Sequence, residues 1–69
     1  PADPEALLDR AALALVQDDF ETALALLLRL HRQDAAYDGG VARKAMQAVF
    51  ALLGEQHPLR RRFQSELLS

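Results

Sequence analysis

Apolar residues recur along this chain at steps of three and four, the spacing of one face of an α-helix. The first run follows Asp3-Pro4, where Asp3 suits a helix cap and Pro4 the first helical position. This helix should end near Gln17. Its apolar residues are Leu7, Leu8, Ala11 and Leu15.

The second run is apolar around most of its circumference, and Asp18-Asp19 before it should cap it. A helix with so little polar surface needs cover on two sides. We therefore predict that it lies in the middle of the fold, between the first and third helices. Its stripe is Phe20, Ala23, Leu24, Leu27 and Leu30, widened by Leu26 and Leu28.

Residues 33–40 read as a loop anchored by Tyr37, with Asp38 or Gly39 as the cap of a third helix. The third helix should span Val41 to Leu53 and stop at Gly54 in a left-handed conformation. Its expected buried face comprises Val41 or Ala42, with Ala45, Met46, Val49, Phe50 and Leu53.

The fourth helix should start at Pro58, after a short turn, and continue to about Leu68. Leu59, Phe63 and Leu67 form its apolar stripe, and no segment alternates apolar and polar residues long enough for a strand. Short connections make successive helices antiparallel neighbours. The predicted fold class is all-α, with four antiparallel helices arranged as two stacked helical hairpins.

Length and composition limit the chain to one domain over residues 1–69, with a modest core. It has no cysteine, which excludes disulfides and fits a reducing cytoplasm. No apolar run is long enough to span a membrane. Because the first residue is Pro1, we expect a fragment of a larger protein. Net charge is −5 over residues 1–28 and +3 over residues 29–69.

The sequence offers no catalytic set, so we expect no enzyme activity, cofactor or metal. His31 and His57 have no third ligand near them and are better explained as helix-end residues. Asp18-Asp19 lacks the spacing of a calcium loop. Arg43-Lys44 should form an ion pair with Asp34 or Asp38.

Arg60, Arg61 and Arg62 are the one cluster that suggests nucleic-acid binding. Consecutive positions fan around a helix instead of forming one patch. Since the whole domain is also acidic, a solvated face or the rim of a site for an acidic protein is favoured over nucleic acid.

The first two helices resemble a tetratricopeptide repeat (TPR). The residues that carry the resemblance are Leu7, Ala11, Phe20, Ala23, Leu27 and Leu30. In that repeat, small residues on the two helices let their backbones approach closely, and Ala11 and Ala23 match them. Phe20 matches the large residue that wedges the hairpin, whereas Ala14 stands where an aromatic residue is usual.

The second half resembles the C-terminal helical domain of bacterial thioredoxin-like co-chaperones, the chaperedoxins. The likeness lies in residues 32–46, Phe50-x-Leu-Leu-Gly54, residues 58–63 and Leu67-Leu68. It implies a thioredoxin-fold parent and a module that holds unfolded clients or docks to the chaperonin or Hsp70. The implied partner-binding residues on the fourth helix are Arg60, Arg61, Phe63, Gln64, Leu67 and Leu68.

Two other functions stay open from the sequence. The chain is alternatively a structural cap or dimerisation module, whose apolar end would make the isolated fragment self-associate. Less favoured is a nucleic-acid binder that uses Arg60, Arg61 and Arg62. In the fourth helix, one of Leu67 and Leu68 should belong to the core and the other should be exposed.

Overall fold

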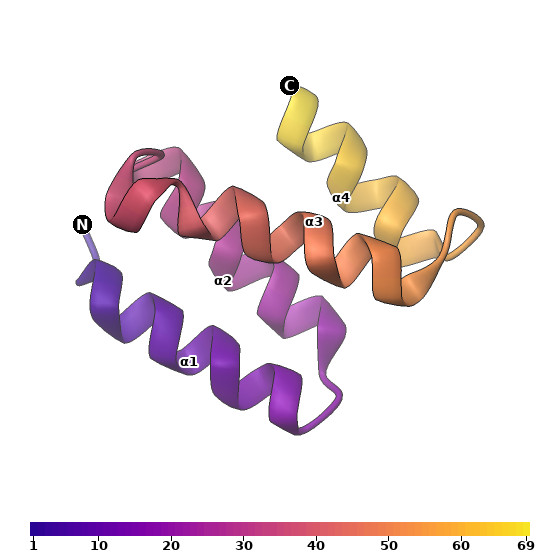
Figure 1. Cartoon of the computed structure of the whole chain (residues 1–69), viewed down its shortest axis with the longest axis horizontal. Helices are drawn as coiled ribbons and strands as arrows, with labels where there is room; N and C mark the ends of the chain where they lie inside the picture. The colour runs from indigo at the N-terminus through magenta and orange to yellow at the C-terminus, as the bar shows by residue number, and fades with distance from the viewer.

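The computed structural model describes all 69 residues and is entirely helical, which confirms the predicted fold class (Figure 1). Successive helices reverse direction along the chain, and a one-turn 3-10 helix, η1, precedes α3 (Figure 1). The elements are α1 (Pro4–Val16), α2 (Phe20–Gln33), η1 (Tyr37–Gly39), α3 (Val41–Leu53) and α4 (Pro58–Leu68).

Local side-chain caps begin three of the helices where the sequence predicts. A carboxylate oxygen of Asp3 accepts a hydrogen bond from the backbone N–H of Glu5 at 3.2 Å. Asp19 accepts from the N–H of Thr22 at 3.2 Å in the same way. At α4, Nδ1 of His57 accepts from the N–H of Leu59 at 3.1 Å. These bonds satisfy backbone donors that a helix start leaves free.

The connection between α2 and α3 differs from the prediction. Residue 40, not Asp38 or Gly39, caps α3, and it does so without a side-chain hydrogen bond. The chain reverses through positive φ at Asp38 (48°) and Gly40 (82°), so turn geometry selects the cap. Gly54 stops α3 as predicted, but its φ of 89° and ψ of 159° lie outside the left-handed helical region.

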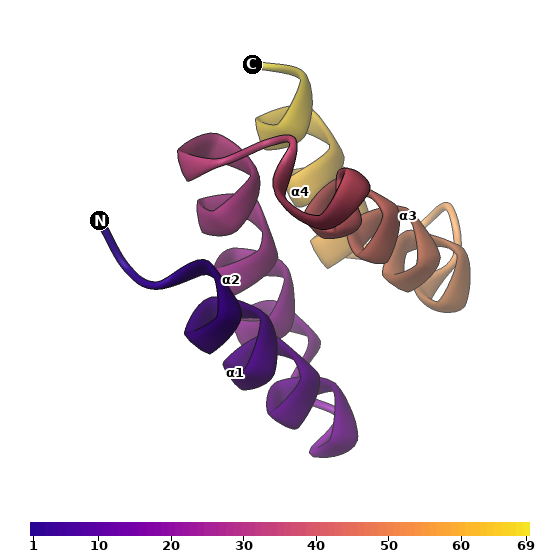
Figure 2. The same cartoon turned by 60° about the vertical axis from the view of Figure 1, so that its left-hand side comes forward.

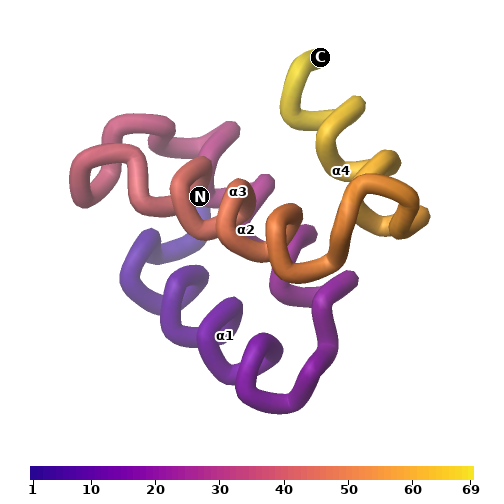
Figure 3. The backbone as a smooth tube through the Cα atoms, turned by 45° about the vertical axis from the view of Figure 1, so that its right-hand side comes forward, coloured from indigo at the N-terminus to yellow at the C-terminus, as the bar shows by residue number.

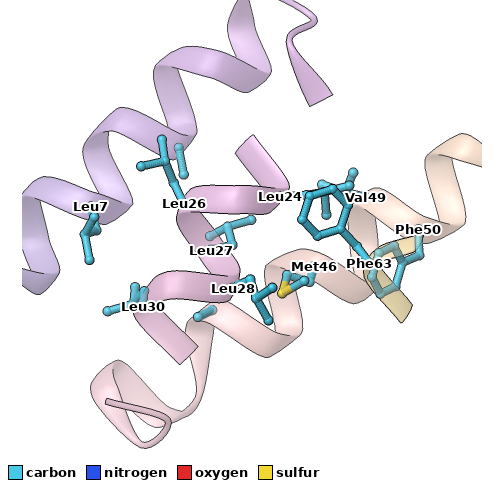
Figure 4. Packing of buried hydrophobic residues seen from close by; sticks show 12 residues of the cluster. Leu7, Leu24, Leu26, Leu27, Leu28, Leu30, Met46, Val49, Phe50 and Phe63 are labelled. Atoms are coloured by element: carbon cyan, nitrogen blue, oxygen red, sulfur yellow. The ribbon is translucent and has the colours of Figure 1, made fainter. Parts of the chain in front are cut away.

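α2 lies at the centre of the fold and contacts α1, α3 and α4, as its apolar circumference predicts (Figures 2 and 3). Leu26 and Leu30 lie on the side towards α1, and Leu24 and Leu28 on the side towards α3 (Figure 4). α2 thus joins one continuous core. Its members are Leu7, Ala11, Leu24, Leu26, Leu27, Leu28, Leu30, Ala42, Met46, Val49, Phe50 and Phe63.

Small residues fill the contact between α1 and α2. Ala11 is 1% exposed and Ala23 is fully buried, while Ala14 is also in the interior. Alanine side chains are small and protein interiors contain little empty space. The backbones of α1 and α2 must therefore lie close together at these positions. Ala14, where the repeat usually has an aromatic residue, follows Ala11 by three positions and is buried on the same face of α1.

α4 is held against α2 by an aromatic ring, an ion pair and the hydrogen bond that Nη2 of Arg32 donates to the backbone carbonyl of Glu66 at 3.2 Å. Phe63 is the single buried residue of α4. The guanidinium of Arg62 lies 4.8 Å from the centre of the Phe63 ring and donates to the Glu21 carboxylate at 2.6 Å. Both charged side chains are more than half exposed, so solvent screens their attraction.

The close α1–α2 approach predicts that Ala11→Leu and Ala23→Leu each lower the free energy of unfolding by about 1–3 kcal/mol through overpacking. Ala12→Leu and Ala25→Leu are matched controls on the exposed faces of the same helices and should change stability little. Urea unfolding followed by circular dichroism measures all four. Equal stability of the buried and exposed variants would refute the close approach.

The Glu21–Arg62 pair should contribute less than about 1 kcal/mol to stability. A double-mutant cycle with Glu21→Gln and Arg62→Gln, measured by urea unfolding, gives the coupling energy between the two side chains. We expect the coupling to shrink further as salt rises from low to physiological concentration. A large coupling that salt does not change would show that the pair is shielded from solvent.

Candidate partner-binding surface

The three neighbouring arginines of α4 have three different environments. Nη1 of Arg60 donates to the backbone carbonyl of Phe50 at 3.2 Å, so this half-buried side chain ties α4 to α3. Arg62 binds Glu21 across the contact with α2. The side chain of Arg61 is exposed and makes no hydrogen bond or ion pair with another residue. The guanidinium groups therefore do not form one basic patch, as helical spacing predicts.

A shallow hollow of 210 Å³ lies where the polar face of α3 meets the last turns of α4. It combines a cation, two amides and two leucines, and is lined by Arg43, Gln47, Gln64, Leu67 and Leu68. Amide and guanidinium groups recognise backbone carbonyls and carboxylates, while the leucines offer apolar contact. The hollow is thus suited to a protein surface of mixed character.

Leu67 and Leu68 divide as the sequence predicts. Leu67 is half-buried and packs against the core cluster. Leu68 is 83% exposed, the largest exposure of any large apolar side chain in the chain. Of the other predicted surface residues, Gln64 lines the hollow. Phe63, however, is 1% exposed and supports α4 from within the core.

The ion pair expected between Arg43-Lys44 and Asp34 or Asp38 is absent, since Arg62–Glu21 is the one salt bridge of the chain. Sequence spacing brought these charges near one another but did not define side-chain directions around the η1 turn. Arg43 consequently faces the hollow with its charge uncompensated by an ion pair.

Arg43 and Gln47 are functional candidates that the sequence alone did not place at this surface. Their spacing of one helical turn on α3 does indicate a shared polar face. Only the packing of α4 on α3 brings that face beside Gln64 and Leu67. The sequence therefore indicates the polar face of α3, but it does not show that α4 packs beside that face.

The remaining titratable groups do not form a reactive cluster. Burial raises the pKa of the Tyr37 phenol, and the negative charges of Glu5 and Asp38 raise that pKa further. No three residues among His, Asp and Glu stand close enough to hold a metal ion. None of the helices has the length and hydropathy required to cross a bilayer.

One comparison with known proteins agrees with this helical architecture. A family model described as Tetratricopeptide repeat matches residues 1–69. Curated proteins and solved structures gave no match. TPR domains generally mediate protein–protein interaction and are typically non-catalytic. With the family model spanning the whole chain and the helical hairpins in place, the chain belongs to the tetratricopeptide repeat family.

Proposed function

We propose that this chain is the helical interaction module of a bacterial thioredoxin-like co-chaperone, and that α4 docks it to the chaperonin. Hsp70 and unfolded clients are further partners of such a module. The family supports protein binding in general. The likeness of residues 32–46 and 58–63 to chaperedoxins supports the narrower role.

One observation carries the choice of surface. Leu68 stands 83% exposed beside Leu67, Gln64 and the unpaired Arg43. Exposed leucine is costly in water and gains about 1.5–3 kcal/mol when a partner covers it fully. Amide and guanidinium groups at its border supply the hydrogen bonds that fix orientation.

The other predicted residues of α4 serve this surface in different ways. Arg61 is free to meet an acidic partner, since it is exposed and unpaired. Arg60 and Phe63 hold the helix in position through the Phe50 carbonyl and the core. Losing either would therefore weaken docking indirectly, by loosening α4.

Leu68→Asp should weaken binding to purified bacterial chaperonin by about tenfold or more, because the interface would have to bury an unpaired carboxylate. Biolayer interferometry measures the affinity, with purified Hsp70 as a second analyte. Deletion of residues 66–69 should weaken binding at least as much. Leu13→Asp is the matched control, since Leu13 is 57% exposed on α1, which does not contribute to this surface.

Thermal melts of each variant separate loss of docking from loss of folding. Unchanged chaperonin affinity after both changes to α4 would refute the surface. A mass that grows with concentration in light scattering, and that Leu68→Asp abolishes, would instead support the alternative of a cap or dimerisation module.

A further inference from the structure

Two neighbouring side chains in the last turn of α2 bond to backbone from opposite ends of the chain. The side-chain amide of Gln33 donates to the carbonyl of Ala2 and accepts from the N–H of the same residue. Nη2 of Arg32 donates to the backbone carbonyl of Glu66 at 3.2 Å. Consecutive residues point about 100° apart on a helix, so one side chain reaches the segment before α1 and the other reaches α4. α2 and α4 end on the same side of the molecule, as Figure 2 shows.

The carbonyl that Arg32 reaches lies in the turn of α4 that carries the proposed docking surface. Glu66 directly precedes Leu67 and Leu68, and both leucines line the hollow beside α3. We call residues 65–68 the docking turn. Arg32 does not itself line the hollow. We therefore expect it to act on this surface through the backbone of the docking turn.

The docking turn has few other donors for its carbonyl groups. The last four carbonyls of an α-helix have no partner within the helix. Ser69 supplies two bonds, from its N–H to the Glu66 carbonyl at 3.3 Å and from its hydroxyl to the Ser65 carbonyl at 3.0 Å. α4 has no basic residue in its own last turn to offset the negative end of its dipole. The guanidinium of Arg32 supplies that positive charge from α2, together with a further hydrogen bond.

Side-chain packing holds the docking turn only in part. Leu67 is half-buried and packs against the core, whereas Leu68 is 83% exposed. Phe63, the one buried residue of α4, lies before this turn. Arg32 is the one side chain of another helix that bonds to the backbone here. Because helix ends fray, the helical state of this turn should depend on that bond.

We propose that Arg32 is a positioning residue for docking. Its bond to the Glu66 carbonyl keeps the docking turn helical and sets Leu67 and Leu68 in their binding arrangement before the partner arrives. This inference rests on the proposed docking function of α4. A partner that needs the helical turn binds only the fraction of molecules that have it, so losing the bond lowers the apparent affinity in proportion to that fraction. The association rate falls and the dissociation rate stays the same, because Arg32 lies outside the bound surface.

The first arm of the test measures the docking turn in the full chain without a partner. Backbone carbon chemical shifts in NMR spectra report its helical population. Arg32→Ala should lower this population, and Arg32→Lys should restore part of it, because lysine keeps a positive charge near the same carbonyl. Arg29→Ala is one matched control, since Arg29 is an exposed cation three positions earlier and has no bond to α4. Gln33→Ala is the other, since Gln33 holds Ala2 instead. Neither control should change the docking turn.

The second arm measures the rate constants of docking to purified bacterial chaperonin by biolayer interferometry. In Arg32→Ala the association rate constant should fall by the same factor as the helical population, up to about fivefold, with the dissociation rate constant unchanged. The two controls should keep both rate constants of the wild-type chain. Thermal melts of Arg32→Ala and the two controls should agree, since Arg32 is exposed and contributes nothing to the core.

Three results would overturn the proposal. An unchanged helical population in Arg32→Ala would show that the bond does not order the docking turn. Faster dissociation with unchanged association would place Arg32 in contact with the partner. An equal loss in Gln33→Ala or Arg29→Ala would assign the effect to the end of α2 in general. A wild-type chain that does not bind the chaperonin would refute the proposed function instead, and the first arm would still decide whether Arg32 orders the turn.

Discussion

The burial of α2 is the constraint on which the rest of this structure depends. Leucines project from this helix towards α1 on one side and α3 on the other, so no single neighbour can cover it. Each fully buried leucine contributes roughly 1.5–3 kcal/mol, more than any exposed ion pair of the chain supplies. The buried members are Ala23, Leu24, Leu26, Leu27, Leu28 and Leu30. α1, α3 and α4 pack around α2 and cover these side chains.

Covering α2 leaves the outer helices with open faces, and the hollows of the molecule lie on those faces. α3 packs on α2 and α4 yet borders two hollows on opposite sides. One hollow joins the exposed Leu68 to the uncompensated cation of Arg43. The other joins the exposed Leu52 to the unpartnered carboxylate of Asp18. The first hollow thus holds one cation and the second one carboxylate, on a domain whose family generally mediates protein–protein interaction.

Features encoded by neighbouring residues were predictable from the sequence, and features encoded by distant residues were not. Asp3, Asp19 and His57 cap helices through bonds that span two or three positions, so their roles followed from local patterns. The cap of α3 depends instead on the backbone path through η1, where Asp38, Gly39 and Gly40 are all suitable N-cap residues by type. Arg60 and Arg62 bind partners 10 and 41 positions away, which no local pattern reveals. The sequence therefore predicted α4 and its candidate residues. It did not predict the hollow, which forms where α4 packs on α3.

Native-state hydrogen exchange tests the central position of α2 most directly. Amides in the interior of α2 should exchange only through global unfolding, because opening this helix exposes the core shared by α1, α3 and α4. Amides of α4, which buries Phe63 alone, should exchange through smaller local openings. Slower exchange in α1 or α4 than in the interior of α2 would contradict the view that α2 holds the fold together.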